Sequence, residues 1–258
     1  MRADYKQDRA KEKGVSGDFA GLGRWQAGAS FGQSEGIMEQ ALVVGASGGI
    51  GAAVALALEG RGYGVTRLSR SVDGLDVTDE ASVQTCLERL DGRFTTVFVA
   101  TGALELGPYR PEKSLRAVDP SAFAAQFALN AAGPLLVLKH ALRLMPRDVP
   151  VQFAALSARV GSIGDNHLGG WYGYRAAKAA LNQLIHTAAI EVARSHPQSV
   201  VVTLHPGTVD TNLTRDHRGG HAAMAPAEAA AHLLTVLDEL TPAQTGGFYD
   251  WQGKSVPW

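Results

Sequence analysis

The sequence predicts an α/β protein in which helices cover both faces of a doubly wound parallel sheet. Short runs rich in β-branched residues alternate with longer segments of helical period, as parallel strands joined by crossover helices require. The runs are almost continuously apolar, which is typical of strands that are buried on both faces. A glycine-rich segment separates the first run from the first helical segment.

Each element is expected from its own pattern. Apolar, β-branched runs predict strands at residues 42–44, 65–68, 96–99, 151–156, 200–204 and 247–249. Apolar residues recurring at the helical period predict helices at residues 49–59, 79–90, 122–144, 172–195 and 226–239. Thr78 is the expected N-cap of the helix at 79–90, because its hydroxyl can accept a hydrogen bond from the first turn.

The composition restricts the class of protein. The 258 residues are 45% hydrophobic and 19% charged, which suits one domain with a sizeable core. With a formal net charge of −1, we expect no general affinity for nucleic acid or an anionic membrane. Cys86 is the only cysteine, which excludes an intrachain disulfide, and the histidines show no spacing typical of a metal site. No apolar run approaches the roughly 20 residues that span a bilayer, so we expect a cytoplasmic protein.

Residues 1–37 differ in composition from the rest of the chain. They mix charged residues with glycine and serine and show no sustained apolar period, which is typical of a disordered extension. Met38 stands directly before the first expected strand, so either it is the biological start or a dispensable extension precedes it. The alternative is a short helix over residues 5–13 that contacts a partner subunit. The expected organisation is an extension, 1–37, followed by one domain, 38–258.

A turn with the spacing Gly-x-x-x-Gly-x-Gly, formed by Gly45, Gly49 and Gly51, lies between the first strand and the first helix. Glycine lets the backbone turn sharply and approach a pyrophosphate, whose charge the N–H groups and dipole of the following helix stabilise. The segment predicts a dinucleotide site, and a tight turn without a ligand is the alternative.

Tyr174 and Lys178 are four residues apart in an expected helix and therefore share one face. A free phenol has a pKa near ~10 and is a poor acid at neutral pH. A neighbouring ammonium favours the phenolate, which lowers that pKa and makes the tyrosine a usable proton donor and acceptor. The pair, taken with the glycine turn, predicts acid–base catalysis.

With these motifs the chain resembles the short-chain dehydrogenase/reductase family over residues 40–258. Asn130 matches the asparagine of the family's catalytic tetrad, and residues 205–211 match its Pro-Gly segment beside the nicotinamide. Residues 76–79 are similar to the acidic motif of the adenine pocket, while Ala-Thr-Gly-Ala at 100–103 stands in place of Asn-Asn-Ala-Gly. The C-terminal segment is similar to the branch of C-factor-like signalling proteins and carbonyl reductases.

The resemblance implies a Rossmann-type fold and a role for each matching residue. Tyr174 would donate a proton to a carbonyl oxygen as hydride arrives from the nicotinamide, Lys178 would lower its pKa and bind the nicotinamide ribose, and Asn130 would hold a water for proton release. A kink residue before a Gly-Pro pair is the alternative for Asn130. The residues implied to bind the cofactor are Gly45, Ser47, Gly49, Ile50, Gly51, Ser69, Arg70, Asp76, Val77, Gly102, Tyr174, Lys178, Pro206, Gly207, Val209 and Thr211.

The serine that orients the substrate is ambiguous in this chain. The family's Ser-Ser-x-x-Gly pattern, anchored on Gly161, places Ser157 on the first serine and Ala158 on the second, which is the catalytic one. Neighbouring strand residues face opposite sides, so both cannot face the cleft unless the strand has ended. We favour Ser157, the hydroxyl nearest the strand end, and Ser162 is the alternative.

The coenzyme is predicted from the end of the second strand. An acidic side chain there binds the ribose 2′-hydroxyl of NAD, whereas a basic one accommodates a 2′-phosphate. Ser69 and Arg70 stand at this point, with no carboxylate at the expected position. Arg70 can fork onto a phosphate, which favours NADP(H) over NAD(H), and a solvated surface arginine is the alternative.

The sequence thus predicts an oxidoreductase that interconverts an alcohol and an aldehyde or ketone with NADP(H). We expect a small hydrophobic carbonyl as substrate and a homodimer or homotetramer, as the family commonly forms. The alternative is a dinucleotide-binding signalling or regulatory protein with little catalysis, since the serine segment departs from the family pattern.

Overall fold

Six parallel strands form one sheet in the computed structural model, which describes residues 38–213 and 222–258. Their order is β2-β1-β3-β4-β5-β6, which confirms the predicted parallel sheet. The strands are β1 (Gln40–Val44), β2 (Gly64–Leu68), β3 (Phe94–Val99), β4 (Val151–Leu156), β5 (Ser199–His205) and β6 (Phe248–Asp250). The expected extension, residues 1–37, lies outside the described residues.

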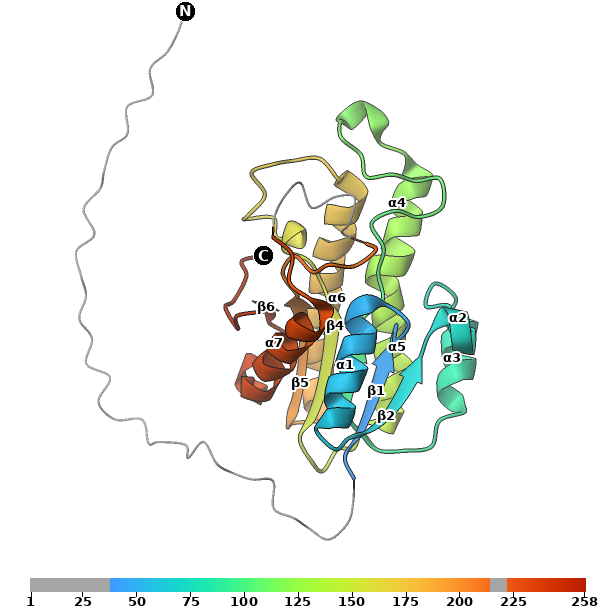
Figure 1. Ribbon diagram of the computed structural model, residues 1–258, viewed down its shortest axis with the longest axis vertical. Helices are drawn as coiled ribbons and strands as arrows, with labels where there is room; N and C mark the ends of the chain where they lie inside the picture. The colour runs from blue at the N-terminus through green and yellow to red at the C-terminus, as the bar shows by residue number, and fades with distance from the viewer. Residues whose placement is uncertain (1–37, 214–221) are drawn as a thin grey trace, which may run out of the picture. The chain divides into compact units, whose positions relative to one another are not determined.

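Helices cover both faces of this sheet, as predicted (Figure 1). On one face, α1 (Gly49–Gly60) and α7 (Pro226–Glu239) enclose a core that includes Val43 and Phe98. On the other face, α3 (Glu80–Glu88), α5 (Gly133–Ala141) and α6 (Tyr172–Ser195) enclose a core that includes Leu42 and Val97. Adjacent strand residues thus belong to different cores, which explains why the strand sequences are apolar throughout.

The helix expected at residues 122–144 is interrupted, so the prediction of one α-helix there is wrong. Its parts are α4 (Pro120–Phe127), a π-helical turn (Ala128–Ala132), α5 and a 3₁₀ turn (Leu142–Leu144). Pro134 explains the interruption, because it lacks an N–H and its ring would collide with the carbonyl of Asn130 in a regular α-helix. The π turn accommodates this and leaves Asn130 buried.

Two smaller expectations differ from the structure, and one short helix was not expected. The N-cap of α3 is Asp79, whose carboxylate accepts from Ala81 N, while the hydroxyl of Thr78 donates to Asp76. A short helix that the sequence did not predict, α2 (Arg70–Asp73), follows β2. The strand expected at 247–249 lies one residue later. Short 3₁₀ turns occupy Leu115–Ala117, Arg159–Gly161 and Pro242–Gln244.

One described helical run, Pro120–Leu144, is long and apolar enough by composition to cross a membrane, and 44% of its most apolar window is buried. The expectation that no apolar segment approaches this length is therefore wrong on length and composition alone. A core helix of a globular protein meets the same criteria, and α5 and the π turn of this run contact α3 and α6. We therefore do not assign Pro120–Leu144 as a membrane-spanning helix.

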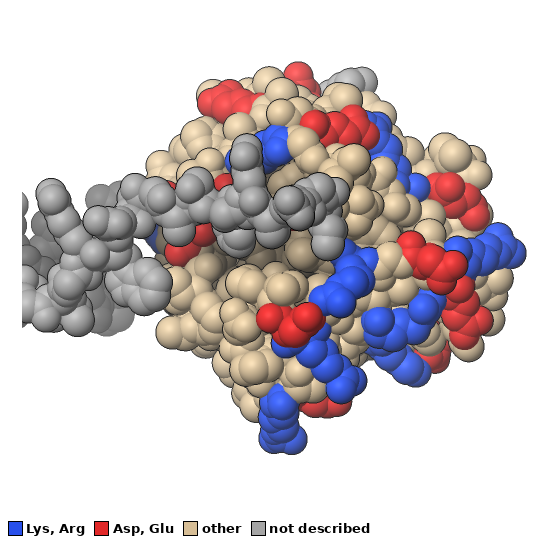
Figure 2. Space-filling model, turned by 90° about the horizontal axis from the view of Figure 1, so that it is seen from below, with Lys and Arg blue, Asp and Glu red and all other residues tan. Residues whose placement is uncertain are grey.

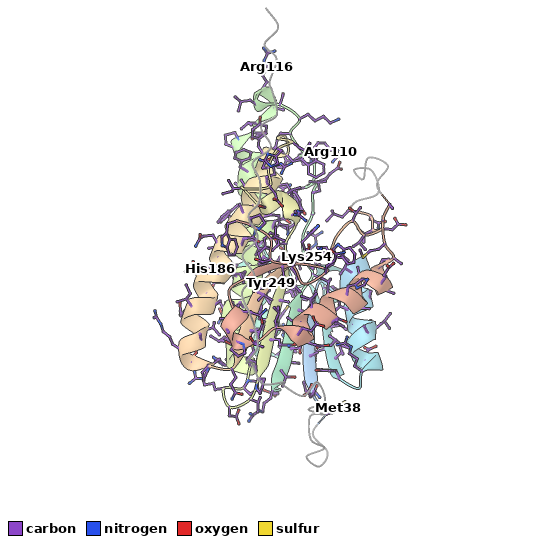
Figure 3. All side chains as sticks on the ribbon, turned by 90° about the vertical axis from the view of Figure 1, so that its left-hand side faces the viewer. Met38, Arg110, Arg116, His186, Tyr249 and Lys254 are labelled. Atoms are coloured by element: carbon purple, nitrogen blue, oxygen red, sulfur yellow. The ribbon has the colours of Figure 1, made fainter. Side chains whose placement is uncertain are left out.

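The two ends of the strands differ in what surrounds them. Met38 lies beside the amino ends of the strands, whereas Arg110 and Arg116 project beyond the carboxyl ends (Figure 3). On the face seen from below in Figure 2, acidic and basic side chains stand next to one another. Arg67 with Glu59 and Arg93 with Asp148 form two of the exposed ion pairs of the protein.

Candidate active site

A cavity of about 850 Å³ opens at the carboxyl ends of the strands. The loops after β1, β3, β4 and β5 line it together with the first half of α6. From β1 the chain runs to β2 on one side and later to β3 on the other, so the strand order reverses here. Open α/β sheets bind ligands at this kind of switch point.

The glycine turn forms one end of the cavity as the sequence predicted. Gly45 has φ +86°, and a Cβ on it would lie 2.9 Å from the carbonyl carbon of Ala100. A Cβ on Gly51 would lie 2.2 Å from the carbonyl oxygen of Gly45, so only glycine lets α1 begin this close to the turn. Ser47, Gly49 and Ile50 line the cavity.

Tyr174 and Lys178 line the same cavity from α6. The ammonium nitrogen of Lys178 lies 5.7 Å from the centroid of the Tyr174 ring and donates a 2.9 Å hydrogen bond to the carbonyl of Leu156. Both side chains are buried. The helical spacing therefore brings the phenol and the ammonium together as expected.

Burial decides the ionisation of this pair. It raises the pKa of the Tyr174 phenol and lowers the pKa of Lys178 to about 7, because removal from water disfavours both charged forms. From the sequence we expected Lys178 to lower the pKa of the phenol. In the structure the pKa of the phenol is raised instead. Both groups share one desolvated environment, which a spacing argument does not reveal.

Asn130 is held by its neighbours from three sides. Its Oδ1 accepts a 3.1 Å hydrogen bond from Ala103 N, and its Nδ2 donates to Ala103 O at 2.9 Å and to Gln126 Oε1 at 2.7 Å. A Cβ on Gly102, which lines the cavity, would lie 2.9 Å from Oδ1 and 3.4 Å from the Lys178 nitrogen. Through its hydrogen bonds to Ala103, the Asn130 side chain thus connects the π-helical turn to the loop after β3.

The two candidate serines lie in different places. Ser157 lines the cavity directly after β4, and its hydroxyl donates a 2.7 Å hydrogen bond to Asn182 Oδ1. Ser162 is buried outside the cavity lining, where its hydroxyl accepts from Asp165 N. Ala158 also lines the cavity. The position of Ser157 favours it over Ser162 for a role at the substrate.

The residues expected to bind the adenosine end do not line this cavity. Ser69 caps α2 and donates its backbone N–H to Asp73 Oδ2 at 2.7 Å, so a carboxylate that the sequence argument did not place stands beside the end of β2. Arg70 is exposed. Asp76 accepts from the N–H and hydroxyl of Thr78, which lower the pKa of its carboxyl, and Val77 is buried against Gly133.

The Pro-Gly segment also lines the cavity, through Pro206, Gly207, Val209 and Thr211. Gly207 has φ +77°, and a Cβ there would lie 2.9 Å from the Trp251 ring. A Cβ on a glycine of the turn, Gly49, would lie 2.9 Å from Thr211 Cγ2. The two predicted cofactor segments thus lie next to each other at Gly49 and Thr211.

Thr101 and His205 are polar residues that line the cavity and had no predicted role there. The hydroxyl of Thr101 and Nδ1 of His205 are buried without a hydrogen-bond partner among the described residues. Burial lowers the pKa of His205 to about 4, although the carboxylate of Asp250 opposes this. His205 is therefore neutral at physiological pH. The position of His205 directly before the Pro-Gly pair could have indicated from the sequence that it lies at the site.

These features fit a nicotinamide dinucleotide. The turn after β1 lines the cavity with the backbone of Gly48 and Gly49, and Gly48, the N-cap of α1, has no side chain that could cap this helix. The orphaned hydroxyl of Thr101 lies on the same cavity. A helix N-terminus with free N–H groups next to a polar cleft is suited to phosphate and ribose.

Comparison with known proteins identifies relatives of this chain. A family model described as enoyl-(acyl carrier protein) reductase matches residues 45–245. The 1-hydroxy-2-glutathionyl-2-methyl-3-butene dehydrogenase of Rhodococcus sp. (strain AD45) is 32% identical over 236 residues, covering 86% of this chain and 100% of that protein. The C-signal protein of Myxococcus xanthus is 37% identical over 143 residues, covering 55% of this chain and 81% of C-signal.

Solved structures agree. A short-chain dehydrogenase/reductase from Burkholderia multivorans with bound NADP superposes with a TM-score of 0.70 at 26% identity, covering 86% of this chain and 100% of that one. An NADPH-bound carbonyl reductase from chicken fatty liver, at 21% identity and a TM-score of 0.71 over 86% of this chain and 94% of that one, shares the fold. The protein therefore belongs to the short-chain dehydrogenase/reductase family of oxidoreductases.

Proposed function

We propose that this protein interconverts an alcohol and an aldehyde or ketone by hydride transfer, with NADP(H) as its coenzyme. The observation that carries the proposal is the position of the Tyr174 phenol, which lines the same cavity as Lys178 and the glycine turn. A proton donor and a dinucleotide cradle in one cavity are the parts that carbonyl reduction needs.

Tyr174 is the proton donor in the direction of reduction. Because burial raises the pKa of its phenol, the tyrosine is protonated at neutral pH. A raised pKa by itself makes the phenol a weaker acid, so donation to the carbonyl oxygen of the substrate requires that the phenolate be stabilised. The nicotinamide, when bound, supplies the hydride that the carbonyl carbon accepts. The carbon gains a hydride and the oxygen gains a proton, so the product is the alcohol.

Three further residues support this step. Lys178 lies close enough to the Tyr174 ring for its ammonium form to stabilise the phenolate that proton donation leaves. We assign Ser157 to orient the substrate carbonyl, because its side chain lines the cavity directly after β4. Among the described residues, Asn130 Oδ1 accepts a hydrogen bond from Ala103 N alone, so its second lone pair can hold a water that returns the proton to the phenolate.

The substrate that suits this cavity is a small hydrophobic carbonyl compound. The side chains of Leu104, Leu168, Trp171 and Leu213 contribute to the lining, and apolar walls of this kind bind apolar ligands. The Rhodococcus relative is named as a dehydrogenase of a hydroxylated compound, which supports an alcohol or carbonyl as the reacting group.

The test is oxidation of NADPH against a panel of aldehydes and ketones. We expect turnover by the wild type and a loss of about 100-fold or more in Tyr174→Phe, since positioned acid–base groups contribute this much. Tyr172→Phe is the matched control, because Tyr172 is on the same helix turn but exposed. Full activity in Tyr174→Phe would contradict the proposal.

A second function is favoured by the likeness to C-signal. In that case the protein binds a dinucleotide and acts as a signalling or regulatory protein with little catalysis. Calorimetric binding of NADPH together with no turnover across the whole panel is the result expected from this function, and turnover that depends on Tyr174 argues against it.

We further propose that the protein is a cytoplasmic homodimer or homotetramer. The apolar side chains of Phe127 on α4 and Ile190 on α6 are 47% and 54% exposed, and this area is available to a partner subunit. Light scattering of the purified protein and fractionation of cells test the two statements. A monomer at micromolar concentration contradicts the first, and recovery with the membrane fraction contradicts the second.

A further inference from the structure

The catalytic helix α6 begins in an unusual way. The three residues before it, Gly169, Gly170 and Trp171, have φ of +66°, +67° and +52°. Trp171 is the only non-glycine residue with positive φ among residues 38–213 and 222–258. It occupies the N-cap position and makes no side-chain cap hydrogen bond. The local sequence therefore leaves the N–H groups of the first turn without the usual partner.

Glu112 provides this partner from a distant part of the chain. Its carboxylate oxygens lie 3.1 and 3.3 Å from the backbone nitrogen of Gly173, and its carbonyl oxygen accepts a 2.6 Å hydrogen bond from Trp171 N. Glu112 is 6% exposed. A negative charge at this position also interacts favourably with the positive end of the helix dipole.

The glycine at position 173 makes room for the carboxylate. A Cβ built on Gly173 would lie 2.9 Å from Glu112 Oε1 and 3.1 Å from a ring carbon of Phe123. The next residue along the helix is Tyr174, whose ring contacts the Trp171 ring edge-on with centroids 6.4 Å apart. The carboxylate thus binds the backbone N–H of the residue that directly precedes Tyr174.

We propose that Glu112 is a positioning residue for Tyr174: it caps the catalytic helix from outside and keeps the phenol at its place in the cavity. The proposal rests on the proposed function, in which Tyr174 is the proton donor. Glu112 is not itself one of the residues that line the cavity, and its carboxylate acts on α6 through the N–H of Gly173 in the first turn. A misplacement of about 1 Å in a reacting group costs roughly 100-fold in rate.

The first test compares Glu112→Ala with Glu112→Gln. We expect kcat to fall about 100-fold in Glu112→Ala while KM for NADPH stays near the wild-type value, because the glycine turn lies on another element. Glu112→Gln keeps an oxygen that accepts from Gly173 N and restores most of kcat. Glu105→Ala is the control, since Glu105 lies on the same loop and pairs with Arg110 at the surface. Wild-type kcat in Glu112→Ala overturns the proposal, and so does an equal loss in Glu112→Gln.

A double-mutant cycle gives a second test that does not depend on Glu112→Ala alone. The Cβ of Gly173→Ala displaces the carboxylate, so this variant lowers kcat in the same way. Once Glu112 is alanine, most of that clash is gone, and the double variant is no slower than Glu112→Ala. Additive losses overturn the proposal.

Hydrogen exchange separates failure of this proposal from failure of the proposed function. We expect Glu112→Ala to speed amide exchange in the first turn of α6 and to leave α1 unchanged, whether or not a substrate is known. If the wild type reduces no carbonyl but this local change occurs, the cap stands and the proposed function fails. Unchanged exchange in α6 overturns the cap itself.

Discussion

The hydroxyl of Ser157 donates a 2.7 Å hydrogen bond to the side-chain oxygen of Asn182, and both side chains are buried. In this arrangement Asn182 Nδ2 is buried and has no hydrogen-bond partner in the part of the chain that the structure describes. If the amide turns by half a rotation, Nδ2 donates to Ser157 and the hydroxyl proton becomes free to point into the cavity. Asn182 therefore controls whether Ser157 can donate to a substrate carbonyl.

Replacement of Asn182 by aspartate tests this control. A carboxylate of the same shape only accepts hydrogen bonds, so it captures the Ser157 proton. We expect Asn182→Asp to lower kcat about 100-fold, the cost of losing one donor at a developing oxyanion. Ser157→Ala should show a similar loss, and the double variant should be no slower than Ser157→Ala. Wild-type kcat in a folded Asn182→Asp protein, checked by circular dichroism, shows that the hydroxyl is not used.

A second prediction concerns the glycine turn. In Gly51→Ala the new Cβ lies 2.2 Å from the Gly45 carbonyl oxygen, so α1 must move away from the turn. We expect a loss of about 1–3 kcal/mol in the free energy of unfolding and a large loss of NADPH affinity by calorimetry. Gly60→Ala is the matched control: it lies in the same helix with nothing within 4 Å of its Cβ position. Unchanged affinity in Gly51→Ala argues against a dinucleotide at this turn.

A third prediction concerns the coenzyme. Arg70 is exposed next to Ser69 at the end of β2 and is free to meet a 2′-phosphate. Hydrogen bonds to charged groups contribute about 1.5–3 kcal/mol, so Arg70→Asp should shift the ratio of kcat/KM for NADPH over NADH about 10- to 100-fold toward NADH. Arg67→Gln is the control, because Glu59 already holds that guanidinium. An unchanged ratio removes Arg70 from the coenzyme site.

A fourth prediction concerns stability in acid. Burial lowers the pKa of His205 to about 4 in the folded protein, against about 6.5 in an unfolded chain. Between these values only the unfolded state binds the proton, so the free energy of unfolding decreases as pH falls from 6.5 to 4, by at most about 1.4 kcal/mol per pH unit. Urea unfolding of His205→Gln should show a weaker decrease over this window. Replacement of the exposed His167 is the control, and a decrease equal to the wild type contradicts the prediction.

Local patterns in the sequence predicted much of the fold and part of the site. The strands and most helices follow from residues that are neighbours in the chain, and the pairing of Tyr174 with Lys178 follows from the helical repeat. The interruption of the helix at Asn130 was harder to predict from the sequence, although Pro134, four residues later, indicates a break in a regular α-helix. The serine was the weakest point, because two hydroxyls lay close to one strand end.

Other features depend on residues that meet only in the folded chain. Asp73 lies beside Ser69 because α2 bends the chain back, and a carboxylate at that place bears on the choice of coenzyme. The pKa of Tyr174 rises because the whole core removes it from water. No periodic pattern or residue spacing in the sequence indicates the position of Asp73 or the raised pKa of Tyr174.

The sequence by itself thus determined the parallel sheet, the glycine turn and the shared helix face of Tyr174 and Lys178, because each follows from short-range geometry. The tertiary structure alone decided that Ser157 faces Asn182, that Glu112 binds the N-terminus of α6, and that burial governs the ionisation of the phenol. These depend on contacts between segments far apart in the chain, which form only when the core packs.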